Sequence, residues 1–176
     1  MTVPSVYYVL CDRSGGQLSA LANRLTAGGK RVVGTLPLNP DPPDPKNCDM
    51  DIRVIPSGAT FRISQSLGPG SAGCRLDAGA LEMAVPAVAA ELAQGADILV
   101  LNKFGKLEAE GRGFCPVIAA ALEKGVPVVL GVNRLNLESL LAWSGGLARE
   151  LKPGGAGSRD IVLASGDMSA DGAAAM

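Results

Sequence analysis

Residues 96–113 of the 176-residue chain read ADILVLNKFGKLEAEGRG, and this stretch decides the predicted fold. Its first six residues, 96–101, form an apolar run that is typical of a buried parallel strand. Similar apolar runs occupy residues 6–10, 30–38 and 126–132, with alanine- and leucine-rich stretches between them. Strands that alternate with helices predict an α/β fold of three layers, in which helices cover both faces of a mainly parallel sheet.

Four helices are expected between the strands. The first is indicated by apolar residues at helical spacing from Leu18 to Leu25 and would end at Gly28-Gly29. The second spans residues 77–94, with Asp77 as its N-cap and with Pro86 predicting a kink or a restart. The other two are expected at 114–124 and 137–149.

Two further extended segments, residues 50–56 and 61–67, are joined by Ser57-Gly58 and predict a β-hairpin inserted into the α/β pattern. A proline-rich surface loop precedes the hairpin at 39–47, and a last strand is expected at 160–164. Neither an internal repeat nor a long linker divides the chain. We therefore expect a single α/β domain over residues 1–165, followed by a disordered tail at 166–176.

The composition excludes several kinds of site. The chain contains no histidine, which excludes Ser-His-Asp and Cys-His catalysis and histidine metal sites. Its four cysteines form no C-x-x-C pair, so no metal site is predicted. A net charge of −1 and an aromatic content of 3% argue against nucleic acid as a partner. Because no apolar run has the length of a membrane span, we expect no membrane partner and a cytoplasmic location.

Ligands of open parallel sheets bind beyond the carboxyl ends of the strands. That rule directs attention to the residues that follow Leu10, Leu67, Leu101 and Val132. The turn after Leu10, residues 11–17, lies where a P-loop would lie, but it lacks the lysine and the hydroxyl of G-x-x-x-x-G-K-[ST]. This Walker A motif is therefore degenerate, and the segment by itself is better interpreted as an ordinary β-α turn with at most a weak anion site.

The segment after Leu67, residues 68–77, reads GPGSAGCRLD. Its glycines let backbone N–H groups approach an oxyanion, Ser71 adds a hydroxyl donor, and Arg75 adds a planar pair of donors. An equally weighted alternative is a flexible turn in which Arg75 pairs with an acid such as Asp77. The candidate ligand-binding residues in and before this segment are Ser64, Gln65, Gly70, Ser71, Gly73, Cys74 and Arg75.

The segment after Leu101, residues 102–113, is the densest polar cluster of the chain. Its candidate ligand-binding residues are Asn102, Lys103, Lys106 and Arg112, because clustered cations can hold a phosphate or another oxyanion. Glu108 or Glu110 could orient a water molecule or a hydrated metal ion. The alternative is a solvated loop with local ion pairs, each worth about 0–1 kcal/mol. The position at the end of the most apolar strand favours the functional interpretation.

Three of these stretches resemble one bacterial family of domains of unknown function: ISQSLG at 63–68, GCRLD at 73–77 and NKFGKLEAEGRG at 102–113. That family is similar to nucleoside-triphosphatases of the thermophile type and is often encoded beside molybdenum-transport genes. In the triphosphatases an acidic residue begins a similar D-E-x-G-K-x-E stretch, whereas Asn102 and Lys103 stand there in this chain. The resemblance, which covers nearly the whole chain, implies a P-loop-NTPase-like fold and one site shared by residues 74–77 and 102–106. It does not imply hydrolysis.

The leading hypothesis is a cytoplasmic binding protein for a small anionic ligand, either a tetrahedral oxyanion or a phosphate-bearing molecule. The family's link to molybdenum makes molybdate or tungstate the candidate ligand. One alternative is a nucleoside-triphosphatase or phosphotransferase that uses Mg-nucleotide, with Glu108 or Glu110 holding the metal or the attacking water. The other alternative is a non-catalytic regulatory or scaffold protein that forms a homo-oligomer.

Overall fold

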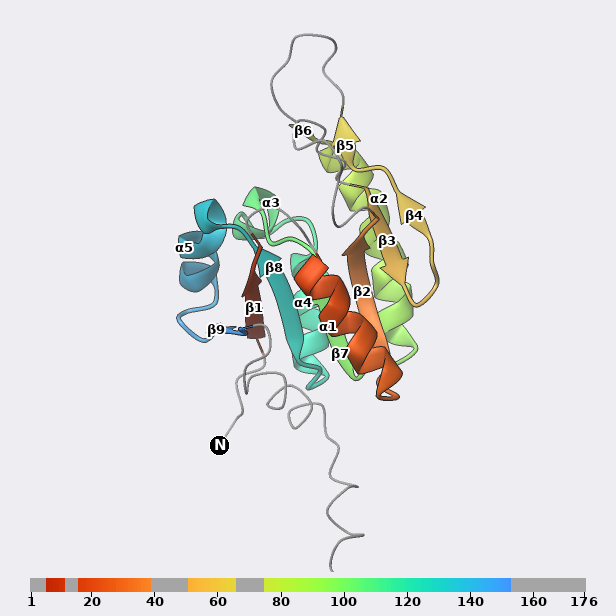
Figure 1. The fold of residues 1–176 in the computed structure, drawn as a ribbon. Helices are drawn as coiled ribbons and strands as arrows, with labels where there is room; N and C mark the ends of the chain where they lie inside the picture. Colours follow the sequence, from red (N-terminus) through yellow and green to blue (C-terminus); the bar gives the residue numbers. More distant parts are fainter. Residues whose placement is uncertain (1–5, 12–15, 39–50, 66–74, 153–176) are drawn as a thin grey trace, which may run out of the picture.

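The computed structural model describes residues 6–11, 16–38, 51–65 and 75–152. In this part of the chain the main sheet has seven strands in the order β4-β3-β2-β7-β8-β1-β9, as Figure 1 shows. Its centre is parallel and confirms the four strands predicted from the apolar runs. These are β1 (Val6–Leu10), β2 (Val32–Pro37), β7 (Ile98–Leu101) and β8 (Val128–Val132).

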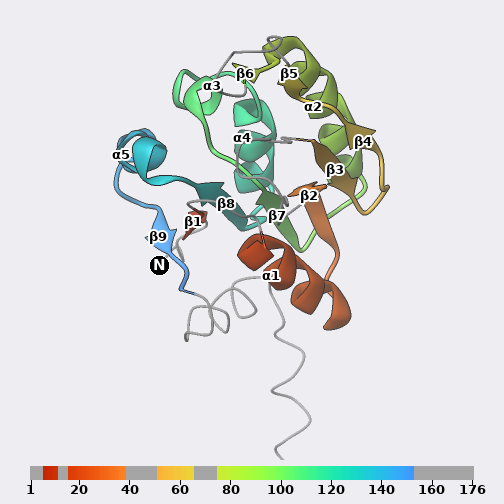
Figure 2. The same cartoon turned by 45° about the horizontal axis from the view of Figure 1, so that its top comes forward.

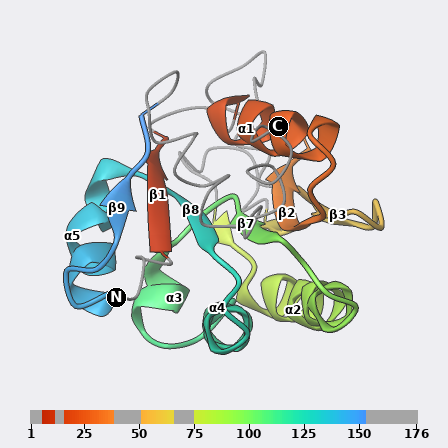
Figure 3. The ribbon, with the colours of Figure 1, turned by 90° about the horizontal axis from the view of Figure 1, so that it is seen from below.

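Helices cover both faces of this sheet, as predicted. Seen from below in Figure 3, α1 (Gly16–Ala27) lies on one face, and α2 (Ala78–Ala93), α4 (Cys115–Glu123) and α5 (Arg134–Trp143) lie on the other. The short helix α3 (Lys106–Ala109) lies on the same side as α2 and α4. The three-layer α/β architecture expected from the sequence is therefore present.

The core is divided into two layers by the sheet because successive strand residues point to opposite faces. In β7, Ile98 and Val100 pack in the cluster on the α1 side, whereas Leu99 and Leu101 pack in the cluster on the α2 and α4 side. All four are at most 1% exposed. A strand that is buried on both faces must be apolar throughout, which explains why residues 98–101 show no alternation in the sequence.

The predicted hairpin is present, but its second strand is shorter than expected. Strands β3 (Ile52–Ile55) and β4 (Thr60–Phe61) pair antiparallel at one edge of the sheet. The segment predicted as one strand at 61–67 is divided, because β5 (Ser64–Gln65) leaves the main sheet and pairs with β6 (Arg75–Leu76). The resulting two-stranded sheet leads directly into α2.

The helix predicted at 137–149 is wrong at both ends. Helix α5 begins at Arg134, because the Asn133 side chain accepts a hydrogen bond from the Asn136 amide at 2.9 Å and caps the first turn. It ends at Trp143, before Gly145 and Gly146, both of which have positive φ. Residues 149–150 form β9 (Arg149–Glu150), a short edge strand parallel to β1.

The helix predicted at 77–94 is confirmed with one correction. Asp77 is its N-cap, and the carboxylate accepts a hydrogen bond from the Ala80 amide at 3.0 Å. Helix α2 continues through Pro86 without restarting, and Pro86 is exposed. The predicted loop at 39–47, the strand at 160–164 and the tail at 166–176 lie outside the described residues.

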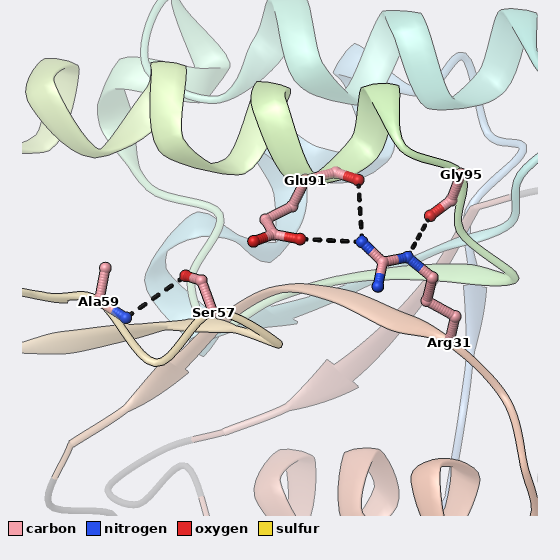
Figure 4. Close-up of polar contacts among 5 residues, drawn as sticks. All are labelled: Arg31, Ser57, Ala59, Glu91 and Gly95. Atoms are coloured by element: carbon pink, nitrogen blue, oxygen red, sulfur yellow. Dashed lines mark hydrogen bonds and ion pairs between the residues drawn. The ribbon is translucent and has the colours of Figure 1, made fainter.

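Arg31 joins the sheet to helix α2 at the amino ends of the central strands (Figure 4). Its guanidinium donates to the Gly95 carbonyl at 2.6 Å and pairs with the Glu91 carboxylate at 2.8 Å. The Arg31 backbone amide donates to Asp97 at 2.7 Å. A cation at the carboxyl end of a helix interacts favourably with the helix dipole. This cluster therefore fixes α2 at the edge of the sheet opposite to the one where ligands are expected.

Candidate functional site

Three parallel strands end side by side at the edge of the sheet where ligands are expected. Cys11 follows β1, Asn102 follows β7 and Asn133 follows β8. The Cys11 amide donates to the Val132 carbonyl at 2.8 Å, and the Phe104 amide donates to the Gly131 carbonyl at 2.6 Å. The backbone is therefore hydrogen-bonded from β1 across β8 to the residues that leave β7, and these segments form one continuous edge.

Gly131 makes the close approach of β8 to the end of β7 possible. A Cβ atom on Gly131 would lie 2.3 Å from the Asn102 carbonyl oxygen, far inside van der Waals contact. This position has no strained backbone conformation, so the requirement for glycine comes from space alone. The sequence VPVVLGV at 126–132 thus contains a glycine that sets how Asn102 and Lys103 leave the sheet.

Thr35 is a residue of this edge that sequence reasoning missed. Its hydroxyl donates to the Asn102 side-chain oxygen at 2.8 Å and accepts from the Asn102 amide at 3.3 Å. Thr35 is fully buried in β2, so this pair fixes the orientation of the Asn102 side chain. The available signal was a threonine inside the otherwise apolar VVGTLP strand, since a buried hydroxyl normally has a partner.

Replacing Thr35 with valine is expected to destabilise the protein by about 1–3 kcal/mol, because it removes the buried hydroxyl that pairs with the half-buried Asn102. Urea denaturation of the variant measures that loss. Thr35→Ser, which keeps the hydroxyl, is the matched control and should retain the hydrogen bond. If Thr35→Val is as stable as Thr35→Ser, then the Asn102 pairing does not stabilise the end of β7.

The loop of residues 105–114, called the cation loop below, is held from inside by Glu108. Glu108 is 3% exposed, and its carboxylate accepts from the Gly105 amide at 3.0 Å and from the Phe114 amide at 3.4 Å. Burial raises the pKa of this carboxyl group, against the lowering effect of its backbone donors. The Cys115 thiol donates to the Glu108 carbonyl at 2.9 Å. Glu108 is thus part of the loop's internal frame.

This geometry corrects one expectation for the enzymatic alternative. Glu108 was a candidate for holding a metal ion or an attacking water, which requires an accessible carboxylate. Both of its oxygens instead face backbone amides inside the cation loop. A Cβ atom on Gly113 would lie 2.5 Å from one of these oxygens, so Gly113 leaves room for the buried carboxylate.

The cations of the segment lie on the outer side of the loop. Lys103, Lys106 and Arg112 are exposed. The Arg112 guanidinium is ion-paired with Glu110, and this pairing lowers the pKa of the Glu110 carboxyl group. The local ion pair anticipated as the alternative is therefore present for Arg112. Lys106 lies in the cation loop, and Lys103 lies in the short segment that joins β7 to this loop.

A hydrogen bond joins the cation loop to the segment that follows the small β5-β6 sheet. The Gly113 amide donates to the Glu82 carboxylate at 3.0 Å. Glu82 lies in α2, which begins after Arg75–Leu76 and is capped by Asp77. In Figure 2 the small sheet, the start of α2 and α3 lie together at the top of the molecule. The cation loop and the start of α2 are therefore joined at this end of the molecule.

Of the predicted ligand-binding residues that precede α2, some are described by their backbone alone, and the others lie outside the described residues. Ser64 pairs with Leu76, and Gln65 pairs with Arg75, in the ladder of the small sheet. Gly70, Ser71, Gly73 and Cys74 lie outside the described residues. Within the described ranges, no group of three or more cysteine, aspartate or glutamate side chains is arranged to hold a metal ion. Helices in those ranges are too short or too polar to cross a membrane.

Comparisons with known proteins match the chain along most of its length. A family model described as a protein of unknown function, DUF2478, matches residues 8–158. The molybdenum import ATP-binding protein ModC 2 of Bradyrhizobium diazoefficiens is 34% identical over 151 residues, which make up 85% of this chain and 17% of that protein. The chain therefore corresponds to a small part of this relative.

A solved structure is similar in fold. It is the crystal structure of THEP1 from the hyperthermophile Aquifex aeolicus, with a TM-score of 0.60 and 14% sequence identity. The superposition covers 90% of this chain and 94% of that one. At this identity the likeness shows the fold alone. It confirms the predicted P-loop-NTPase-like α/β fold.

Proposed function

The chain belongs to the DUF2478 family, whose function is unknown, and we propose that it binds a compact oxyanion or a phosphate-bearing ligand at the carboxyl edge of its sheet. The observation that carries the proposal is the Gly113–Glu82 hydrogen bond. It ties the cation loop to the helix that follows Arg75, which supports a site shared by two polar segments that are distant in the sequence. Open α/β sheets bind their ligands at this edge.

The charge at this edge suits an anion. Lys103 follows β7 and Lys106 lies in the cation loop, and both are exposed; Arg75 lies just before α2. Hydrogen bonds from such cations to an oxyanion are stronger than neutral ones. The internal bonds of Glu108 fix the loop before any ligand arrives, which reduces the entropy lost on binding. We propose that Lys103, Lys106 and Arg75 contact the ligand together, with the glycine-rich segment at 68–74 adding backbone donors.

We propose molybdate or tungstate as the ligand, bound by a cytoplasmic protein. Both are compact tetrahedral anions whose oxygens accept N–H bonds from several directions. Support comes from the relative whose name concerns molybdenum import, although this chain matches only 17% of it.

A phosphate-bearing nucleotide is the second candidate ligand, favoured by the fold and by the ATP-binding name of the relative. Turnover is not part of the proposal. The turn after β1 lacks the P-loop lysine and hydroxyl. Asn102 stands at the end of β7 with its side chain bonded to Thr35. Glu108 is buried and Glu110 is paired with Arg112. Binding without hydrolysis is therefore the expected behaviour.

Equilibrium dialysis against molybdate, sulfate and phosphate tests the proposal. We expect saturable binding of at least one of these anions. Arg75→Ala should weaken it by about tenfold to a hundredfold, because a charge-assisted hydrogen bond is worth about 1.5–3 kcal/mol. Arg149→Ala, which removes an exposed arginine from edge strand β9, is the matched control and should bind normally.

Two outcomes would contradict the proposal: no saturable binding of any of the three anions, or binding that is the same in wild type and Arg75→Ala. Turnover of Mg-ATP and Mg-GTP is measured on the same samples and should not exceed the protein-free rate. Turnover above that rate which is lost in Glu110→Gln would replace binding by phosphoryl transfer as the function.

A further inference from the structure

Glu108 is a buried acid that the proposed ligand contacts do not use. Its carboxylate closes the cation loop by accepting hydrogen bonds from both ends of it, from the Gly105 amide at 3.0 Å and from the Phe114 amide at 3.4 Å. Gly113 lies against the same carboxylate, where even a Cβ atom would be only 2.5 Å from an oxygen. The loop is therefore built around this one side chain.

The surroundings of Glu108 disfavour its charge. Burial is the largest cause of its raised pKa, and the negative charge of Glu82 on α2 raises the pKa further. The amides of Gly105 and Phe114 act in the opposite direction. From α4, the Cys115 thiol donates to the Glu108 carbonyl, and the Glu108 charge contributes to the raised pKa of that thiol. The charged state is thus favoured by backbone amides: those of Gly105 and Phe114 at the two ends of the loop, and that of Glu108 itself.

We infer that Glu108 is a positioning residue whose carboxylate acts as a proton-controlled latch on the cation loop. This inference rests on the proposed function in that the cation loop carries Lys106 and begins two residues after Lys103, so a fixed loop positions both lysines for the anion. The ionised carboxylate offers an acceptor to each of the two amides. The protonated carboxyl group has a hydroxyl that must donate, so one of the two amides loses a good acceptor and that end of the loop is released.

Ionisation of Glu108 closes the loop, but it lowers the free energy of unfolding of the whole protein. A carboxyl group whose pKa is raised in the folded state contributes stability below its unfolded pKa, and this stability is lost as the pH rises through the folded pKa. The ordinary value is 4.5, so the loss begins there and is complete once the pH has passed the raised pKa of the folded state. The closed loop at neutral pH therefore exists at the expense of global stability, as is usual for strain at functional positions.

Amide NMR of the wild-type protein tests the latch without any ligand. Between pH 4.5 and neutrality, the Gly105 and Phe114 amide signals should titrate together, with one midpoint above the ordinary glutamate value of 4.5. Hydrogen exchange, corrected for the intrinsic rates, should become faster on the acid side of that midpoint at the amide that loses its acceptor. Signals that do not titrate, or amides that stay equally protected on both sides, would overturn the inference even if the protein binds anions.

Sulfate affinity tests the consequence for binding, because sulfate keeps its two charges across this pH range. Near neutrality, Glu108→Gln should bind sulfate about tenfold more weakly than the wild type. Toward acid pH, the wild-type affinity should fall by about tenfold more than the affinity of Glu108→Gln, whose pH profile should be flatter. Glu138→Gln, an exposed change on α5, should behave as wild type. Parallel pH profiles of sulfate affinity in wild type and Glu108→Gln would refute the latch. If sulfate, phosphate and molybdate all fail to bind at any pH, the proposed function is refuted, but the NMR result still tests the latch.

Discussion

Replacing Gly34 with alanine is expected to destabilise the protein by more than about 3 kcal/mol, a large part of the stability of an ordinary domain. Gly34 lies in β2 opposite Val100 of β7. A Cβ atom at this position would lie 1.7 Å from the Val100 carbonyl oxygen, and the backbone has a φ of +145°. Since the contact is with backbone in the sheet centre, no side chain can move aside to relieve it. Urea denaturation and the yield of soluble protein measure the effect.

Gly58→Ala is the matched control for this prediction. Gly58 also has a positive φ, +85°, but a Cβ atom there would meet nothing within 4 Å. Its alanine variant therefore carries only the conformational cost, about 1 kcal/mol. A Gly34→Ala protein as stable as Gly58→Ala would mean that β2 and β7 do not approach as closely as the structure has them.

Gly131→Ala is expected to damage both stability and ligand binding. The new methyl group would lie 2.3 Å from the Asn102 carbonyl oxygen, and the Gly131 carbonyl accepts from Phe104 at 2.6 Å. Relieving that overlap must separate the ends of β7 and β8 and displace Lys103. We expect a loss of about 2–3 kcal/mol in the free energy of unfolding, together with anion binding weakened by at least about tenfold.

Gly28→Ala controls for the second prediction, because its nearest neighbour would be the Leu25 carbonyl oxygen at an ordinary 3.4 Å. Denaturation and dialysis on the same preparations separate the two effects. If Gly131→Ala is destabilised but binds anions with wild-type affinity, the ligand does not depend on the position of Lys103. If neither property changes, the close approach of β8 to Asn102 is wrong.

The sequence predicts the central sheet well because its signals are local. Strands β7 and β8 are unbroken apolar runs, and the Asp77 cap precedes α2 as expected. The two-residue strands β5, β6 and β9 are too short to carry any periodicity, so their pairing depends on tertiary contacts. The start of α5 was missed although Asn133 has the residue type of an N-cap.

The candidate site was predictable in position and less so in detail. The rule that ligands bind at the carboxyl ends of parallel strands selected residues 102–113, and the structure places them at that edge. The sequence does not show that Glu108 points inward, because that depends on Gly113 leaving space across the loop. Thr35 was missed because it is 67 residues from its partner Asn102. A sequence pattern that spans only a few neighbouring residues does not reveal polar pairs between residues so far apart in the chain.

The most direct measurement of the central claim is the position of tungstate in crystals of the protein, read from its anomalous scattering. We expect one strong peak at the carboxyl edge of the sheet, within hydrogen-bonding distance of Arg75 and of Lys103 or Lys106. A peak that contacts only one of the two segments, or that lies away from this edge, would contradict it.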